Sequence, residues 1–228
     1  MKTNSPILIL LETSAECCSA AISRGEEILA SRKSETSRQH ASMLAPFVRD
    51  TLADCGLSVR DCDAVAVSGG PGSYTGLRVG VSTAKGLCFG AGIPLISVDT
   101  LEILAWQGYG RAERIVPMLD ARRMEVYCAV FDSQCHKLSP TEARILDENS
   151  FCDLLAEGTV LFIGDGAEKF SKVCSSPSAT FDGSGPVATA MARAATKAWQ
   201  EKRFEDIAYF EPFYLKEFVA GKSKKSLL

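Results

Sequence analysis

The chain has 228 residues, about one and a half typical domains, which is enough to bury a core without disulfides or metals. Hydrophobic residues make up 46% and charged residues 23%, so extended disorder, collagen and coiled coils are excluded on composition. The net charge of -3 argues against a chain that holds nucleic acid through its overall field, although a local basic patch stays open.

In the first half we expect three strands joined by tight turns, over Ile7–Leu11, Cys18–Ile22 and Ile28–Ser31. Apolar residues at helical spacing then predict a helix over Met43–Cys55, in which Pro46 favours a kink or a late start and Gly56 marks the end. The elements expected next are a strand over Ala64–Val67, a glycine-rich loop over Ser68–Ser73, a helix over Tyr74–Gly90, a strand over Pro94–Val98 and a helix over Thr100–Gln107.

The second half repeats this order of elements without a residue-level repeat. Its expected strands lie over Ile115–Leu119, Met124–Phe131, Ala143–Leu146 and Val160–Ile163, and its expected helices over Asn149–Ala156, Ala167–Val173 and Val187–Arg203. A loop is expected over Cys174–Pro186, with room for a strand at Ala179–Phe181, and a frayed tail over Gly221–Leu228. Two α/β lobes with mixed sheets flanked by helices are therefore predicted, over residues 1–108 and 109–228, with the last segment able to pack back on the first lobe. The cleft between such lobes is the default ligand site.

The nine cysteines have no Cys-x-x-Cys spacing, and Cys17 and Cys18 are adjacent, which fits neither a disulfide framework nor a zinc ribbon. We expect reduced, buried thiols in a cytoplasmic protein. The apolar run Ile7–Leu11 is too short for a signal sequence, and no stretch reaches the roughly 18 apolar residues of a membrane helix. No membrane association is predicted.

The most informative motif, Ser68-Gly-Gly-Pro-Gly-Ser-Tyr-Thr-Gly76, joins a predicted strand to a predicted helix. Such a loop directs backbone N–H groups toward one point and favours an anion there, but the lysine of a Walker loop is missing. The alternative is a tight turn that lets the helix pack closely on the sheet. No firm cofactor site follows, and the weak candidates are Gly69, Gly70, Gly72 and Ser73 here, with Gly164, Asp165 and Gly166 at a second strand–helix turn.

The helix after this motif has two distinct faces at about 100° per residue. One face carries small residues that allow a backbone to approach, namely Gly76, Gly80, Thr83 and Gly90. The other is apolar and consists of Leu77, Val81, Ala84 and Cys88. One face can serve the sheet of its own lobe, which leaves the other for a partner helix, unless both faces are used within the chain.

Two acids, Glu12 and Asp120, end the first strand of each half. In a two-lobed phosphotransferase, acids at these places hold a metal or orient a water, whereas turn carboxylates are the common alternative. The hairpin Asp120–Glu125 is typical of a solvated turn. His40 and His136 have no metal partners by spacing, and no nucleophile elbow is present. No catalytic and no metal-binding residue is therefore predicted.

These residues resemble the TsaB family, formerly YeaZ, of bacterial tRNA threonylcarbamoyladenosine biosynthesis proteins. The most specific part of the resemblance is the string from Gly69 to Arg78. The segments that carry the rest are Leu8–Ser14, Ser37–His40, Ala84–Leu87, Ile93-Pro94 and Val98–Leu101, and, more thinly, Asp120–Arg122, Glu125–Tyr127 and Pro212–Lys216.

The resemblance implies a two-lobed actin/Hsp70-like (ASKHA) fold and a non-catalytic relative of the TsaD enzyme, within the so-called glycoprotease family. The catalytic relatives carry His-x-x-x-His where this chain has Thr100 and Leu104. Threonine is a poor metal ligand and leucine is none, so an iron or zinc site is not expected. Glu12 stands where an aspartate is common among relatives, which weakens the case for metal-bound phosphate chemistry.

The resemblance also implies partners: a TsaD-like paralogue, a TsaE-like ATPase, a second copy when the chain is alone, and tRNA only through the complex. Together these transfer threonylcarbamoyl to adenosine 37 of ANN-decoding tRNAs, with metal and ATP expected on the partners. The implied pairing surface uses the first two helices, and the expected interface residues are Met43, Phe47, Tyr74, Leu77, Val81, Ala84 and Cys88. The alternative function is an autonomous ATP-dependent small-molecule kinase of the same superfold.

Overall fold

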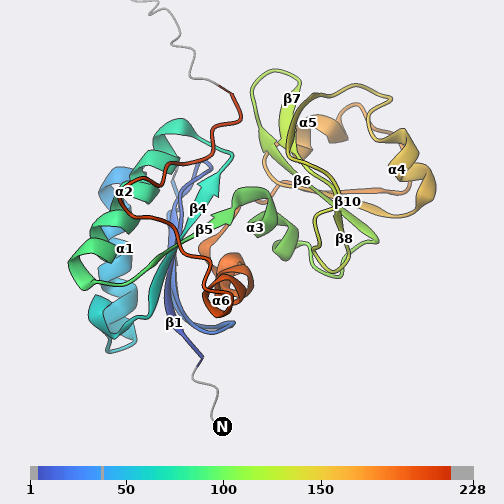
Figure 1. The fold of residues 1–228 in the computed structure, drawn as a ribbon. Helices are drawn as coiled ribbons and strands as arrows, with labels where there is room; N and C mark the ends of the chain where they lie inside the picture. Colours follow the sequence, from blue (N-terminus) through green and yellow to red (C-terminus); the bar gives the residue numbers. More distant parts are fainter. Residues whose placement is uncertain (1–4, 37–38, 217–228) are drawn as a thin grey trace, which may run out of the picture.

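The structure, a computed structural model, describes residues 5–36 and 39–216, which form two lobes that each contain one mixed sheet (Figure 1). The strands of the first sheet are β1 (Ile7–Glu12), β2 (Ser19–Arg24), β3 (Glu27–Lys33), β4 (Ala64–Gly70) and β5 (Leu95–Asp99), in the order β3-β2-β1-β4-β5. The first three strands are antiparallel, and β1, β4 and β5 are parallel.

The second sheet repeats this topology strand for strand. It consists of β6 (Arg114–Asp120), β7 (Glu125–Cys128), β9 (Glu142–Ile145), β10 (Val160–Ile163) and β11 (Ala179–Asp182), in the order β11-β10-β6-β7-β9, with β8 (Phe131–Asp132) paired to β6. The repeated element order of the two halves is therefore confirmed as a repeated architecture.

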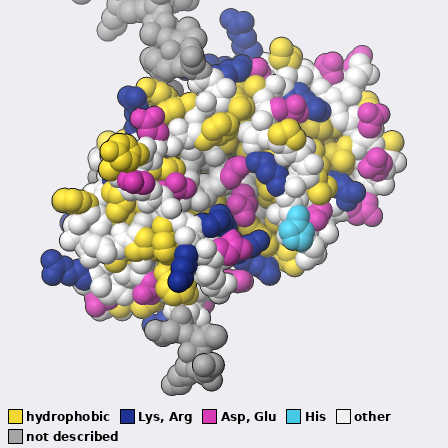
Figure 2. Space-filling view, viewed as in Figure 1, with side chains coloured by type: hydrophobic (Ala, Val, Ile, Leu, Met, Phe, Trp, Pro, Cys, Tyr) yellow, Lys and Arg dark blue, Asp and Glu magenta, His cyan; other side chains and the backbone are white. Residues whose placement is uncertain are grey.

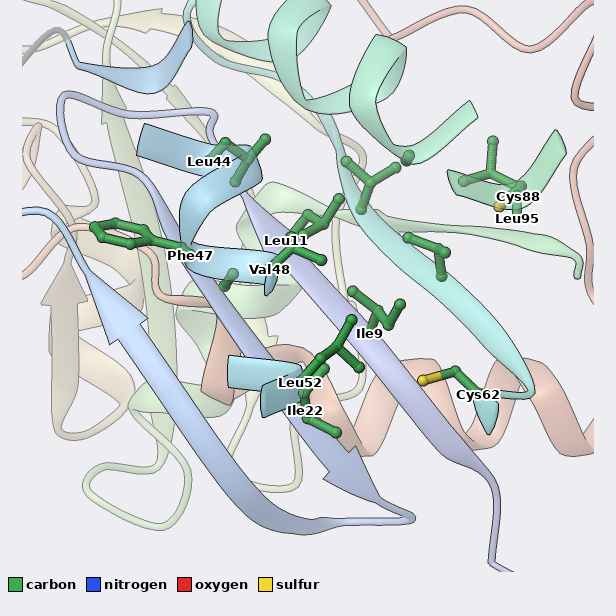
Figure 3. Packing of buried hydrophobic residues seen from close by; sticks show 14 of the residues in the cluster. Ile9, Leu11, Ile22, Leu44, Phe47, Val48, Leu52, Cys62, Cys88 and Leu95 are labelled. Atoms are coloured by element: carbon green, nitrogen blue, oxygen red, sulfur yellow. The ribbon is translucent and has the colours of Figure 1, made fainter. Parts of the chain in front are cut away.

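Alternation along β1 shows how the first lobe builds a core on both sides of its sheet. Ile9 and Leu11 face α1 (His40–Asp54) and α2 (Tyr74–Ala91), as Figure 3 shows. Leu8 and Leu10 face the opposite side, where the 3-10 turn η2 (Ala188–Met191) and α6 (Ala192–Gln200) cover the sheet. All four side chains are fully buried.

The two lobes exchange their last helices. Helix α3 (Thr100–Gln107) follows the first sheet, yet its Leu101 and Leu104 pack against β6 and β10 of the second. Helix α6 follows the second sheet and packs on the first. The last segment therefore packs back on the first lobe, one of the two placements that the sequence left open.

The remaining helices are short: η1 (Val59–Asp61) in the first lobe, with α4 (Cys152–Glu157) and α5 (Ala167–Ser171) covering the second sheet. Several predicted elements, including the helices over 74–90 and 100–107 and the strand over 160–163, agree with the structure to within a residue. The predicted tail Gly221–Leu228, and Ser37 and Arg38 of the family-like motif, lie outside the described residues.

Two predictions of local structure were wrong, and one alternative of a third is removed. The strand over 124–131 is broken into β7 and β8, because Pro117 of β6 stands opposite the gap and has no N–H to donate. The helix over 187–203 is a 3-10 turn followed by the shorter α6, which ends before Lys202 at a φ of 55°. Of the kink and the late start that Pro46 favoured, the late start does not occur, because α1 begins at His40 and contains Pro46; the kink stays a prediction.

Candidate functional site

The glycine-rich segment is shorter than predicted, since β4 runs on to Gly70 and α2 starts at Tyr74. Its glycines admit other parts of the chain. A Cβ at Gly72 would lie 2.5 Å from the carbonyl oxygen of Ser14, and one at Gly76 would lie 2.0 Å from that of Thr13. The backbone of the β1–β2 turn thus occupies the space beside the start of α2.

The two preceding glycines have similar roles. A Cβ at Gly69 would meet the hydroxyl of Ser97 at 2.0 Å, and one at Gly70 would meet the carbonyl oxygen of Phe213 at 2.4 Å. Ser73 is the N-cap of α2, where its hydroxyl accepts a hydrogen bond from the N–H of Gly76 at 3.2 Å. The geometry favours the interpretation of a tight turn over that of an anion cradle.

Glu12 ends β1 beneath this turn and is fully buried. Its Oε1 accepts hydrogen bonds from the N–H of Ser14 at 2.6 Å and from the Ser14 hydroxyl at 2.5 Å, while Oε2 has no partner among the described residues. Burial raises the pKa of Glu12 to about 7, and the hydrogen bonds from Ser14 oppose that rise. Glu12 therefore serves its own turn and does not face an open site.

The matching acid of the second lobe has another environment. Asp120 ends β6, is exposed, and forms an ion pair with Lys169 of α5 at 2.6 Å. Its backbone N–H donates to Asp165 Oδ1 at 2.8 Å, and burial raises the pKa of the Asp165 carboxyl. A Cβ at Gly164 would lie 2.2 Å from the carbonyl oxygen of Met118, so this turn also is required for packing.

The apolar face of α2 packs against the sheet of its own lobe, which corrects the prediction that this face is left over for a partner. Five of the seven expected interface residues are buried within the chain: Phe47, Leu77, Val81, Ala84 and Cys88. Figure 3 shows Phe47 and Cys88 in the core between the helices and the sheet. Met43 and Tyr74 are half-buried. The alternative that both faces are used within the chain is the one that holds here, because Gly76 and Gly80 of the small-residue face pack against Thr13.

The opposite side of α2 is open to solvent. Ser82 and Gly86 are exposed, and Phe89 is 86% exposed. None of the described residues lies within 4 Å of a Cβ placed at Gly86 or Gly90. On α1, which lies beside α2, Ala41 and Ala45 are exposed. The two helices therefore present small side chains and one large apolar ring on a common outer surface, which we call the outer α1–α2 face (Ala41, Ala45, Ser82, Gly86, Phe89).

The positions implied to replace a histidine pair lie inside the fold. Thr100 and Leu104 are both fully buried in α3, and the Thr100 hydroxyl has no partner among the described residues. His40 lies within 2.8 Å of the carbonyl oxygen of Ala15, and His136 contacts Asp132 at 3.0 Å on the surface. The described ranges hold no group of three or more His, Cys, Asp or Glu placed to share a metal ion.

One feature that sequence reasoning missed is a C-terminal strap, residues 204–216, which crosses α2 (Figure 1). Phe213 donates its N–H to the carbonyl oxygen of Gly69 at 2.7 Å, and the ring of Tyr214 lies 4.9 Å from that of Tyr74. Lys216 then forms an ion pair with Glu125 of the second lobe. The Pro212–Lys216 motif was a signal for this strap, but its place in the fold could not be read from it.

A hollow lined by Arg144, Ile145, Phe151 and Cys152 lies on the outer side of the second lobe, away from all the candidate residues above. Among residues 5–36 and 39–216, no helix is both long and apolar enough to cross a membrane.

The comparisons with known proteins agree with one another. A family model described as "TsaD: tRNA N6-adenosine threonylcarbamoyltransferase" matches residues 26–226. The chain is 40% identical over 123 residues to the "tRNA threonylcarbamoyladenosine biosynthesis protein TsaB" of Haemophilus influenzae, covering 53% of this chain and 51% of that protein. It is 29% identical over 217 residues to the Bacillus subtilis protein of the same name, covering 92% and 93%. The chain thus spans about half of the first relative and nearly all of the second.

Solved structures show the same relationship. "YeaZ from Pseudomonas aeruginosa" superposes with a TM-score of 0.80 at 29% identity, covering 92% of this chain and 100% of that one. The activator of 2-hydroxyisocaproyl-CoA dehydratase from Clostridium difficile, with bound ADPNP, gives a TM-score of 0.50 at 10% identity, covering 86% and 96%. The second likeness concerns the fold alone, and it confirms the predicted two-lobed actin/Hsp70-like architecture.

Proposed function

The chain belongs to the TsaB/YeaZ family, within the wider TsaD family, and from this premise we propose that it is a non-catalytic subunit in the synthesis of threonylcarbamoyladenosine on tRNA. In this proposal it pairs with a TsaD-type enzyme and works with a TsaE-type ATPase, and the partners hold the metal and the ATP. Alone, it pairs with a second copy of itself. The substrate of the complex is adenosine 37 of ANN-decoding tRNAs.

Two places in the fold could hold a reaction centre, the buried positions in α3 and the start of α2. The non-catalytic role rests on the observation that neither is available to a ligand. Thr100 and Leu104 are buried and offer no imidazole to a metal. The space beside the start of α2 is filled by the Thr13–Ser14 backbone. Because its own backbone fills the candidate site, the chain has no room there for a substrate. This favours a role in which it supports a catalytic partner.

The outer α1–α2 face supports the pairing role. Small side chains at Ala45 and Gly86 let a partner helix approach closely, and the exposed ring of Phe89 offers the kind of apolar anchor on which interfaces depend. The same face pairs two copies about a twofold axis or one copy with a homologous partner. This face replaces the buried residues that periodicity suggested.

The test of this face is Phe89→Asp, with Leu138→Asp as the matched control because Leu138 is 53% exposed on the second lobe. We expect calorimetry to show at least ten-fold weaker binding of Phe89→Asp to the TsaD-type enzyme, with an unchanged thermal midpoint for the isolated monomer. The control should bind normally. Unchanged affinity of Phe89→Asp would remove the proposed face.

The non-catalytic role is tested by reconstitution. Modified tRNA should form only when this chain and the TsaD-type enzyme are both present, and the chain alone should neither modify tRNA nor hydrolyse ATP. The kinase alternative needs Glu12 and Asp120 to face one phosphate. Glu12 instead accepts a hydrogen bond from Ser14, and Asp120 forms an ion pair with Lys169. Tight Mg-ATP binding by the lone chain, lost in Asp120→Ala, would favour the kinase instead.

A further inference from the structure

The tip of the β6–β7 hairpin carries two arginines in an unusual backbone conformation. Arg122 and Arg123 have φ angles of 73° and 51°, a region that residues with a side chain rarely adopt. Both are exposed, and within the described part of the chain neither guanidinium has an ion-pair or hydrogen-bond partner. The hairpin therefore holds two unpaired positive charges in solvent. The positive φ angles strain its backbone, and exposing two arginines does not by itself require that strain.

A group of planar side chains, an arginine over a tyrosine ring and a second tyrosine tilted against it at 41°, lies beside this hairpin. The Arg78 guanidinium carbon is 4.2 Å from the centre of the Tyr74 ring, and the Tyr214 ring lies 4.9 Å from the same ring. Phe213, next to Tyr214, is 50% exposed. Arg78 is exposed at the start of α2 and has no ion pair among the described residues.

The ion pair between Lys216 and Glu125 brings the two features together, because it joins the end of the strap to the base of the hairpin. Figure 1 shows the strap ending beside the β6–β7 turn, and Figure 2 shows basic side chains standing out along this edge of the molecule. We call the combined surface the arginine–tyrosine face (Tyr74, Arg78, Arg122, Arg123, Tyr214).

The carboxylates nearby do not cancel the charge of the guanidiniums. Glu125 is paired with Lys216, and Asp120 is paired with Lys169. Asp165 lies deeper, accepts a hydrogen bond from the Asp120 N–H, and has a raised pKa because it is largely buried and faces Asp120 and Glu16. Within residues 5–36 and 39–216, the guanidiniums of Arg78, Arg122 and Arg123 thus have no acidic partner, in a chain whose net charge is -3.

We propose that the arginine–tyrosine face binds RNA directly, with Arg122 and Arg123 on phosphates and an unpaired base stacked against the Tyr214–Tyr74–Arg78 group. Guanidinium and aromatic planes side by side are the means by which proteins bind single-stranded and looped RNA. An acidic protein surface would need the charges but not the cluster of aromatic rings beside them, so RNA is the better fit. The inference rests on the proposed function, which brings tRNA to the complex, and adds a direct contact from this chain.

The experiment measures binding of the full chain to a labelled, unmodified anticodon stem-loop RNA at about 50 mM salt, beside an RNA duplex with the same number of phosphates. The loop should bind several-fold more tightly than the duplex. Arg122→Asn combined with Arg123→Gly should weaken loop binding about ten-fold and reduce the slope of log Kd against log salt by about 1–2, as expected for two lost phosphate contacts. Asparagine and glycine tolerate a positive φ, so this variant keeps the hairpin folded.

The matched control is Arg24→Ala with Arg60→Ala, which removes two exposed arginines at the opposite end of the first sheet and should leave binding unchanged. Tyr214→Ala should abolish the preference for the loop. Equal loss in the control pair, equal affinity for the duplex, or no RNA binding at all would overturn the inference. Calorimetry with the TsaD-type enzyme separates the two proposals, because the hairpin variant should still pair normally.

Discussion

At the scale of single residues, the burial of Glu12 makes the stability of the folded chain depend on pH. Its pKa is about 7 in the folded chain, raised from an ordinary value of 4.5 that applies once the chain unfolds. Because the folded state holds the proton more tightly, the contribution of Glu12 to stability is complete below about pH 4.5 and is lost as the pH rises through 7. The full difference is about 3 kcal/mol, since each pKa unit is worth about 1.4 kcal/mol.

Glu12→Gln should remove this pH dependence, because the amide is neutral throughout and its oxygen can still accept from the N–H and hydroxyl of Ser14. The free energy of unfolding, measured in urea between pH 5 and pH 8, should fall by about 2.5 kcal/mol less for the variant than for the parent. Glu157→Gln is the matched control, because Glu157 at the end of α4 is exposed and its carboxylate has no partner among the described residues. Parallel curves for Glu12→Gln and the parent would contradict a buried, proton-binding Glu12.

At the scale of the element, α2 carries glycines with opposite roles. Gly76 faces the Thr13 backbone, whereas a Cβ at Gly86 would have no neighbour within 4 Å in the described part of the chain. Gly76→Ala should therefore destabilise the monomer by about 1–3 kcal/mol through overpacking. Gly86→Ala should stabilise it by about 0.5–1 kcal/mol through helix propensity. Urea midpoints in dilute solution measure both, and the same sign for the two variants would refute this division of the helix.

The same helix shows how far sequence reasoning reaches. Helical spacing predicted α2 and its two faces, because periodicity is a local property. Whether a face is used inside the chain or left for a partner depends on contacts that are distant in sequence, such as those of Gly76 and Gly80 with Thr13, and the spacing alone was compatible with either outcome. The glycine turn was found for the same local reason, but its filling by Thr13 and Ser14 required the fold. Likewise, the repeated element order predicted two lobes and left the placement of α6 open, but it did not indicate that α3 packs on the second sheet.

At the scale of the whole molecule, the exchanged helices make each lobe depend on the other. Leu104 of α3 belongs to the core of the second sheet, although α3 follows the first. The only two tryptophans of the chain, Trp106 on α3 and Trp199 on α6, pack against the core on which α6 rests. Their fluorescence therefore reports the layer between the sheets, while far-ultraviolet circular dichroism reports both lobes.

This arrangement predicts one cooperative unfolding transition, in which fluorescence and circular dichroism coincide in urea. Leu104→Ala should lower the free energy of unfolding by about 3 kcal/mol, as for a fully buried leucine, and should shift both signals together. Leu138→Ala, at an exposed position of the same lobe, should shift neither by more than about 0.5 kcal/mol. If Leu104→Ala separated the two signals, the lobes would unfold independently, and α3 could not be the element that links the second core to the first.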